Sequence, residues 1–86
     1  MPCVIADSKG AITYIHGRTG RFLEPAPGKA AMNVLQMARK GLDRHLPTML
    51  RVAASQGKEI RRENLRVQAN GEEIRANVTV KPIEER

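Results

Sequence analysis

The chain has 86 residues, a mass of 9.5 kDa and a formal net charge of +6 at pH 7. Hydrophobic residues make up 41% of it, but ten of them are Ala, and Tyr14 and Phe22 are the only aromatic residues. A chain this short buries only roughly 60% of its unfolded surface when it folds. These numbers predict one small domain, or a piece of one, over residues 1–86, with a core that is enough for only one thin layer of helices on a small sheet.

The cysteine, histidine and hydropathy content excludes further classes. Cys3 is the only cysteine, so no intrachain disulfide is possible, and Cys3, His16 and His45 do not supply the four ligands of a structural zinc site. No apolar run approaches the ~18 residues that span a bilayer, and the N-terminus lacks a signal-peptide pattern. We therefore expect a cytoplasmic protein with no metal site and no membrane insertion.

Positive charge gathers in the middle of the chain, and this basic centre consists of Arg18, Arg21, Lys29, Arg39, Lys40, Arg44 and Arg51. Residues 1–57 carry eight Lys or Arg against three acidic residues, whereas residues 58–86 carry seven against six. A basic centre attracts nucleic acid, anionic lipid or an acidic protein over long range. We favour a solvated surface that keeps a small domain soluble, because charge alone defines no site geometry.

The first expected element is a hairpin over residues 3–16. Two apolar runs flank residues 7–10, Asp-Ser-Lys-Gly, whose side chains favour a reversing turn. A four-residue turn pairs Ile5 with Ile12 and Cys3 with Tyr14. This register places these four residues on one face of the hairpin.

A connector and two helices are expected next. Residues 24–28, Glu-Pro-Ala-Pro-Gly, cannot form the interior of a helix. Apolar residues at helical spacing predict one helix over 29–40, ended by Gly41, and a second over about 42–56, ended by Gly57. Pro47 lies near the second turn of the latter, so this helix is either kinked or begins at Leu46.

A second hairpin is expected over residues 60–81. Residues 70–71, Asn-Gly, are a strong type I′ turn signal, and residues 73–81 alternate strictly between polar and apolar. A two-residue turn pairs Val67 with Ile74, so the apolar faces of both strands coincide. Ile60 has the wrong parity for this face, which predicts a bulge within residues 61–64 or an Ile60 that faces elsewhere. Two antiparallel hairpins with helices on one face define an α+β fold.

This element order resembles that of a PAS sensory domain, in which strands A and B precede the helices and strands G, H and I follow them. The likeness covers residues 3–83, and residues 5–14 follow the family's usual opening of strand, Asp- and Gly-containing turn, and strand ending in an aromatic. Residues 14–28, 37–42 and 65–67 are similar to the PAS module of bacterial chemotaxis-type proteins that fuse a methylesterase to a methyltransferase. The resemblance implies a non-enzymatic sensory and dimerisation module of a two-component or chemotaxis-like signalling protein, with any activity in flanking domains.

The resemblance also implies a missing strand. PAS sheets have five strands in the spatial order B-A-I-H-G, whereas four are recognisable here, and the central strand I would follow Arg86. The domain is therefore expected to be truncated at its C-terminus. Because exposed strand edges invite pairing, we expect strand A to join strand H directly, or a neighbouring copy to fill the gap in a homodimer or strand-exchanged assembly.

Binding is a better prospect than catalysis for this chain. Ser8 and Ser55 have no acid–base partner nearby in the sequence, and Glu72 and Glu73 flank a tight turn as solvated charges. A small-molecule pocket would be enclosed by an inner sheet face (Ile5, Ile12, Tyr14, Val67, Ile74 and Val78) and a helix stripe (Leu35, Met49 and Leu50), although the same residues also make an ordinary core. The candidate ligand-binding residues are Tyr14, His16, Arg18, Arg21, Phe22, Leu35 and Met49, in which the two arginines would hold a carboxylate or phosphate.

No cofactor is expected. Residues 17–23 resemble the motif Gly-Arg-x-Cys-Arg-Phe-Leu of flavin-binding PAS light sensors, but Gly20 stands where that family's cysteine attacks the flavin. The flavin adduct is therefore excluded. Haem sensors of the family carry an axial His on the longer helix, and His45, beside Pro47, is better explained as an exposed residue at the helix start.

The alternative function is a small basic α+β domain that binds nucleic acid. It would use the arginines on the polar face of the second hairpin, Arg61, Arg62, Arg66 and Arg75. Arg66 and Arg75 are expected directly opposite each other, an unfavourable pairing unless an anion or acid neutralises it. The scarcity of aromatic residues for base stacking makes nucleic acid the less favoured partner.

Overall fold

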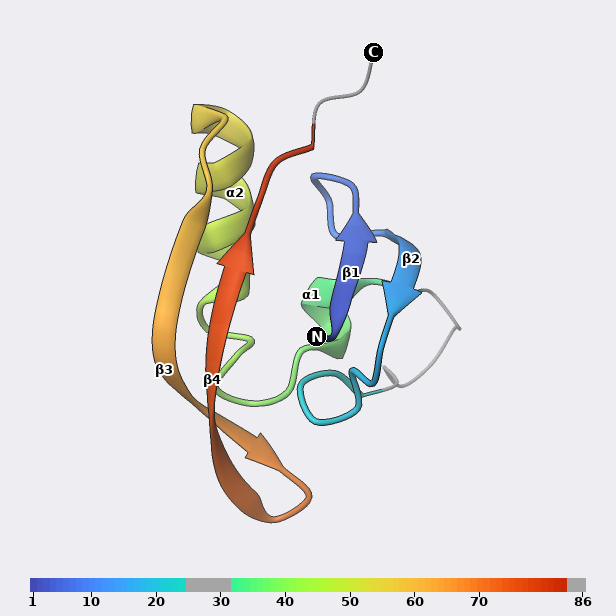
Figure 1. Ribbon diagram of the computed structural model, residues 1–86, viewed down its shortest axis with the longest axis vertical. Coiled ribbons are helices and arrows are strands. Elements are labelled where there is room, and N and C mark those ends of the chain that lie inside the picture. Colours follow the sequence, from blue (N-terminus) through green and yellow to red (C-terminus); the bar gives the residue numbers. More distant parts are fainter. Residues whose placement is uncertain (25–31, 84–86) are drawn as a thin grey trace.

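The computed structural model describes residues 1–24 and 32–83. In chain order the elements are β1 (Cys3–Ala6), β2 (Ile12–His16), α1 (Val34–Met37), α2 (Leu46–Gln56), β3 (Ile60–Ala69) and β4 (Glu72–Val80). They form a small α+β fold in the predicted order (Figure 1). Residues 25–28 of the predicted connector and residues 29–31 of the predicted first helix lie outside the described residues.

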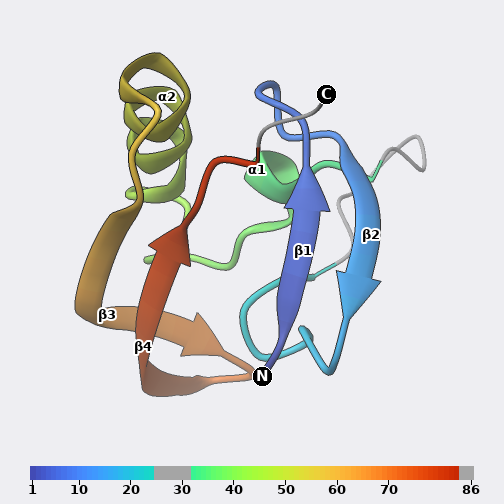
Figure 2. The same ribbon diagram turned by 45° about the horizontal axis from the view of Figure 1, so that its top comes forward.

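The four strands form two separate antiparallel sheets, β1–β2 and β3–β4. β1 and β4 lie side by side and point the same way (Figures 1 and 2), yet no backbone ladder joins them within the described ranges. The expected direct pairing of the first strand with the last is therefore wrong. The physical reason is that each hairpin is anchored elsewhere: the first by backbone hydrogen bonds to residues 32–34, and the second by α2 and a bond to Lys40.

The second hairpin has the predicted register. Val67 pairs with Ile74, the Asn-Gly turn has positive φ at both positions, and the predicted bulge lies between Arg62 and Leu65. Asn64 adopts φ 60° in this bulge, and its backbone N–H donates to Oδ1 of Asn77 at 2.9 Å. The bulge lets Ile60 enter the ladder after all.

The register of the first hairpin differs from the prediction. Ile5 pairs with Tyr14 and Ala6 with Ile12, so Thr13 is an extra residue in β2. The Asp7 carboxylate accepts hydrogen bonds from the backbone of residues 9 and 11, which makes the turn longer than the expected four residues. Because of the extra residue, Ile12 and Tyr14 face opposite sides of the hairpin despite their spacing of two.

The helical segments are shorter than predicted. Instead of continuing to residue 40, α1 stops at Met37, because Ala38 is extended and bridges to Leu23. Residues 40–45 form turns, and α2 begins at Leu46 with Pro47 in its first turn. Of the two predicted alternatives, a kinked helix and a start at Leu46, the structure has the second. Gly57 ends α2 with φ 62° in the left-handed region.

One hydrophobic cluster joins both hairpins and the helices. Its buried members are Leu23, Val34, Leu42, Leu46, Leu65, Val67 and Ala76. Val4, Ala6 and Ile12 of the first hairpin pack against this cluster from the side. The two sheets therefore share a core although they share no ladder.

Asn33 connects the first hairpin to α1. Its Oδ1 accepts from the backbone N–H of Leu35 at 2.9 Å, and its Nδ2 donates to the carbonyl of Lys9 at 3.2 Å. We expect Asn33→Ala to lower the free energy of unfolding by about 1–2 kcal/mol, because it removes an N-cap and an interelement bond. Urea unfolding measures this, with exposed Gln36→Ala as control. Equal midpoints for the two variants would rule out the connecting role.

Candidate functional site

The candidate ligand-binding residues are spread over β2, the loop after it, and both helices. They are Tyr14, His16, Arg18, Arg21, Phe22, Leu35 and Met49. Met49 is 2% exposed and Tyr14 is 53% exposed, His16, Arg18 and Arg21 are also exposed, and none of the seven lines the cavity described below. The structure therefore does not bring them together around one described cavity.

Tyr14 and His16 lie on the outer face of the first hairpin. Tyr14 is 53% exposed and sits opposite Ile5, which is 42% exposed, while His16 lies opposite the exposed Cys3. The prediction that Ile5 and Tyr14 belong to the inner face is wrong, because the extra residue Thr13 changes the parity of β2. Cys3, Ile5 and Tyr14 instead form an outer apolar patch.

The other apolar candidates lie in or against the core. Phe22 and Leu35 are half-buried and pack against the hydrophobic cluster, and Met49 is 2% exposed on α2. The inner-face prediction for the second hairpin is confirmed, since Val67 is fully buried and Ile74 packs beside it.

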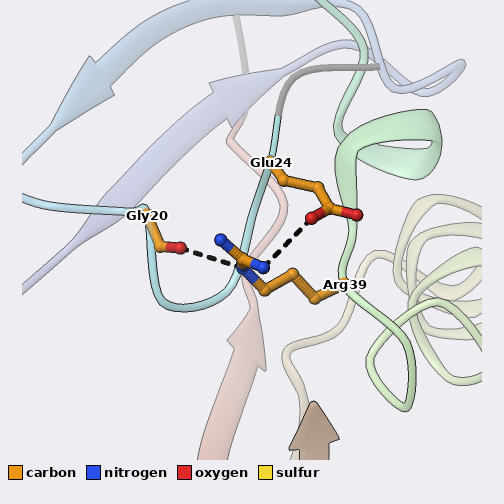
Figure 3. A network of polar contacts seen from close by, with 3 residues as sticks. All are labelled: Gly20, Glu24 and Arg39. Atoms are coloured by element: carbon orange, nitrogen blue, oxygen red, sulfur yellow. Dashed lines mark hydrogen bonds and ion pairs between the residues drawn. The ribbon is translucent and has the colours of Figure 1, made fainter. Parts of the chain in front are cut away.

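Arg18 and Arg21 are exposed on the loop after β2, and neither is paired with an acid among the described residues. The arginine that holds a carboxylate here is Arg39. Its Nη1 lies 3.0 Å from Oε2 of Glu24, and its Nε donates to the carbonyl of Gly20 at 2.9 Å (Figure 3). Arg39 thus fastens the loop at 20–24 to the segment that leaves α1.

An open cavity of about 450 Å³ lies between residues 40–45 and β3. The lining residues are Lys40, Gly41, Arg44, His45, Asn64, Leu65, Arg66 and Gln68. Three of them are basic (Lys40, Arg44 and Arg66), and no acidic residue is among them. We call this feature the basic cavity.

Backbone contacts fix the walls of the basic cavity. The N–H of Gln68 donates to the carbonyl of Lys40 at 2.9 Å, which docks the loop on the outer edge of β3. Gly41 has φ 102°, and a Cβ there would overlap the carbonyl oxygen of Arg66. The bulge at Asn64 bounds the cavity further along β3.

The sequence did not predict the basic cavity. The sequence places Lys40 and Arg44 in the basic centre and Arg66 on the alternative nucleic-acid surface, and no sequence pattern predicts that these residues lie close together. Gly41 is the one sequence feature that points to the cavity. Its position predicts the end of a helix, whereas in the structure its positive φ permits the close approach of the loop to β3.

Comparison with known proteins gave no match, whether to a family model, a curated protein or a solved structure. None of the helices in the described part of the chain has the length and apolarity needed to cross a membrane. Across residues 1–24 and 32–83, no group of three or more His, Cys, Asp or Glu side chains is placed to hold a metal ion.

Proposed function

We propose that this chain is a non-enzymatic PAS-like module of a cytoplasmic bacterial signalling protein of two-component or chemotaxis type. It relays the state of a ligand or partner to flanking domains, and it associates with a second copy through the open edges of β1 and β4. The signal would be passed on by a population shift, because association stabilises one arrangement of the two hairpins relative to each other over the alternatives. The resemblance of the sequence supports the family, and the β1 and β4 edges that have no partner strand among residues 1–24 and 32–83 support the mode of association.

The observation that carries the proposal is the outward direction of backbone groups on β4. In a hairpin with a two-residue turn, every second residue pair exchanges hydrogen bonds, beginning with the pair that flanks the turn. Glu73 and Arg75 fall on the other pairs, so their N–H and C=O groups point away from β3. The N–H of Gln68, opposite Glu73, follows this rule, because it points outward to Lys40.

The free edges of β1 and β4 suit one additional strand. The two strands point the same way (Figure 2), so an extended segment inserted between them would run antiparallel to both. Each added backbone bond contributes roughly 0.5–1.5 kcal/mol. Ile5 on β1 and its partner Tyr14 on β2 are exposed on the outer face of the first hairpin, and this apolar surface favours a protein neighbour over water, which is why we assign the strand to a second copy.

Arg75→Pro tests this association. Proline deletes the outward N–H of residue 75 but no bond to β3, and edge positions tolerate it. We expect the wild-type chain to approach a dimer's molar mass with rising concentration in sedimentation experiments, and Arg75→Pro to remain monomeric with its circular dichroism unchanged.

Arg75→Ala is the matched control, because it removes the same side chain and keeps the N–H. It should associate like the wild type. A wild-type chain that stays monomeric to millimolar concentration, or an Arg75→Pro variant that dimerises normally, would overturn the proposed association.

The structure does not favour the alternative of nucleic-acid binding. Among the four arginines of the second hairpin, Arg61 lies 3.0 Å from Glu63 and Arg75 lies 4.0 Å from Glu73. Acidic neighbours reduce the positive potential that phosphate backbones require. Nucleic acid therefore stays the less favoured partner.

A further inference from the structure

We propose that the basic cavity binds a small phosphorylated molecule. The cavity lies against β3, on the side of the second hairpin away from β1, so this site is separate from the proposed association edge and does not rest on it. Its volume of about 450 Å³ falls within the range of small-molecule pockets.

The charge of the cavity lining favours an anion, and the acid of the 40–45 loop, Asp43, is engaged by the backbone N–H of Gly41, which donates to its Oδ1 at 3.0 Å. Lys40, Arg44 and Arg66 line it, and none of them has an acidic partner in the part of the chain that the structure describes. His45 and Gln68 add further polar groups to the lining. Two guanidinium groups and an ammonium group match the several oxygens of a phosphate, because arginine donates in a fixed fork and lysine supplies a point charge.

Arg66 gives an independent reason for an anion. It pairs directly with Arg75 across the β3–β4 ladder, and like charges in this position destabilise a sheet. Arg75 has Glu73 at 4.0 Å, whereas no described acid neutralises Arg66. An anion in the cavity would relieve this repulsion from the side of Arg66.

The walls of the cavity are preorganised. The Gln68–Lys40 backbone bond and the close approach at Gly41 fix one wall, and the bulge at Asn64 is held by the side chain of Asn77. The buried Leu65 is an apolar lining residue that excludes water from beneath a ligand. A rigid site of this kind loses little entropy when it binds.

The test is a titration of the full chain with inorganic pyrophosphate at constant ionic strength, followed by the backbone amide signals in nuclear magnetic resonance. We expect saturable shifts at residues 41, 64, 66 and 68. Arg66→Gln should weaken binding at least tenfold. Arg51→Gln, which removes an equal charge from an exposed position on α2 outside the cavity, should change it less than twofold.

Other outcomes overturn the proposal. Weak shifts spread over all basic residues, with equal losses in both variants, would mean only counterion binding. Citrate that binds as tightly as pyrophosphate would remove the preference for phosphate. A short DNA duplex that binds through these residues while pyrophosphate does not would assign the surface to nucleic acid instead.

Discussion

Gly41→Ala should be the most damaging single substitution in the loop that docks on β3. The new Cβ would overlap the carbonyl oxygen of Arg66, and alanine would have to adopt φ 102°. Because the obstacle is backbone in a paired strand, the loop must move away and give up the bond between Gln68 and Lys40. We expect a loss of at least about 3 kcal/mol in the free energy of unfolding, measured by urea titration.

Gly57→Ala is the matched control for this prediction. Gly57 also has positive φ, at 62°, but a Cβ there would meet nothing within 4 Å. Its cost should be only the left-handed strain of about 1–2 kcal/mol. If the two variants lose equal stability, the close approach of Gly41 to β3 does not matter for folding.

Met49→Ala should have an effect of similar size through the core. Met49 is 2% exposed, and truncating a buried Met to Ala costs about 2–5 kcal/mol through lost burial and the cavity that remains. Small domains have only about 5–15 kcal/mol of total stability, so we expect a partly unfolded population at 37 °C by circular dichroism.

Met32→Ala gives the comparison for Met49. Met32 is 50% exposed, so its truncation should lower the free energy of unfolding by less than about 1 kcal/mol. A Met49 variant as stable as the Met32 variant would show that α2 is not packed as the structure has it.

The second hairpin was predictable because its signals are local. Strict alternation fixed which residues face the core, the Asn-Gly pair fixed the turn, and together they gave the observed pairing of Val67 with Ile74. The parity of Ile60 predicted either a bulge or an Ile60 that faces elsewhere, and the structure has the bulge. The position of Pro47 predicted either a kinked helix or a start at Leu46, and the structure has the start at Leu46.

The first hairpin was less predictable because both of its faces are apolar. With no polar face to set the register, the long turn at Asp7 and the extra residue Thr13 decided which side chains turn outward. Neither feature has a distinct sequence signature. Tyr14 was therefore assigned to a pocket, whereas it lies on the surface.

The basic cavity escaped prediction because it depends on a tertiary contact. Lys40 and Gln68 are distant in the sequence, and only the docking of the loop on β3 brings their neighbours together. The early end of α1 has the same cause, since Ala38 bridges to Leu23 in place of another helical turn.

The association of two copies through the β1 and β4 edges is most directly tested by hydrogen exchange at the Arg75 amide. We expect this N–H to become protected as the protein concentration rises, while the amide of Ile74, which is bonded to Val67 within the hairpin, stays protected throughout. An Arg75 amide that exchanges at the same rate at every concentration would contradict the proposed association.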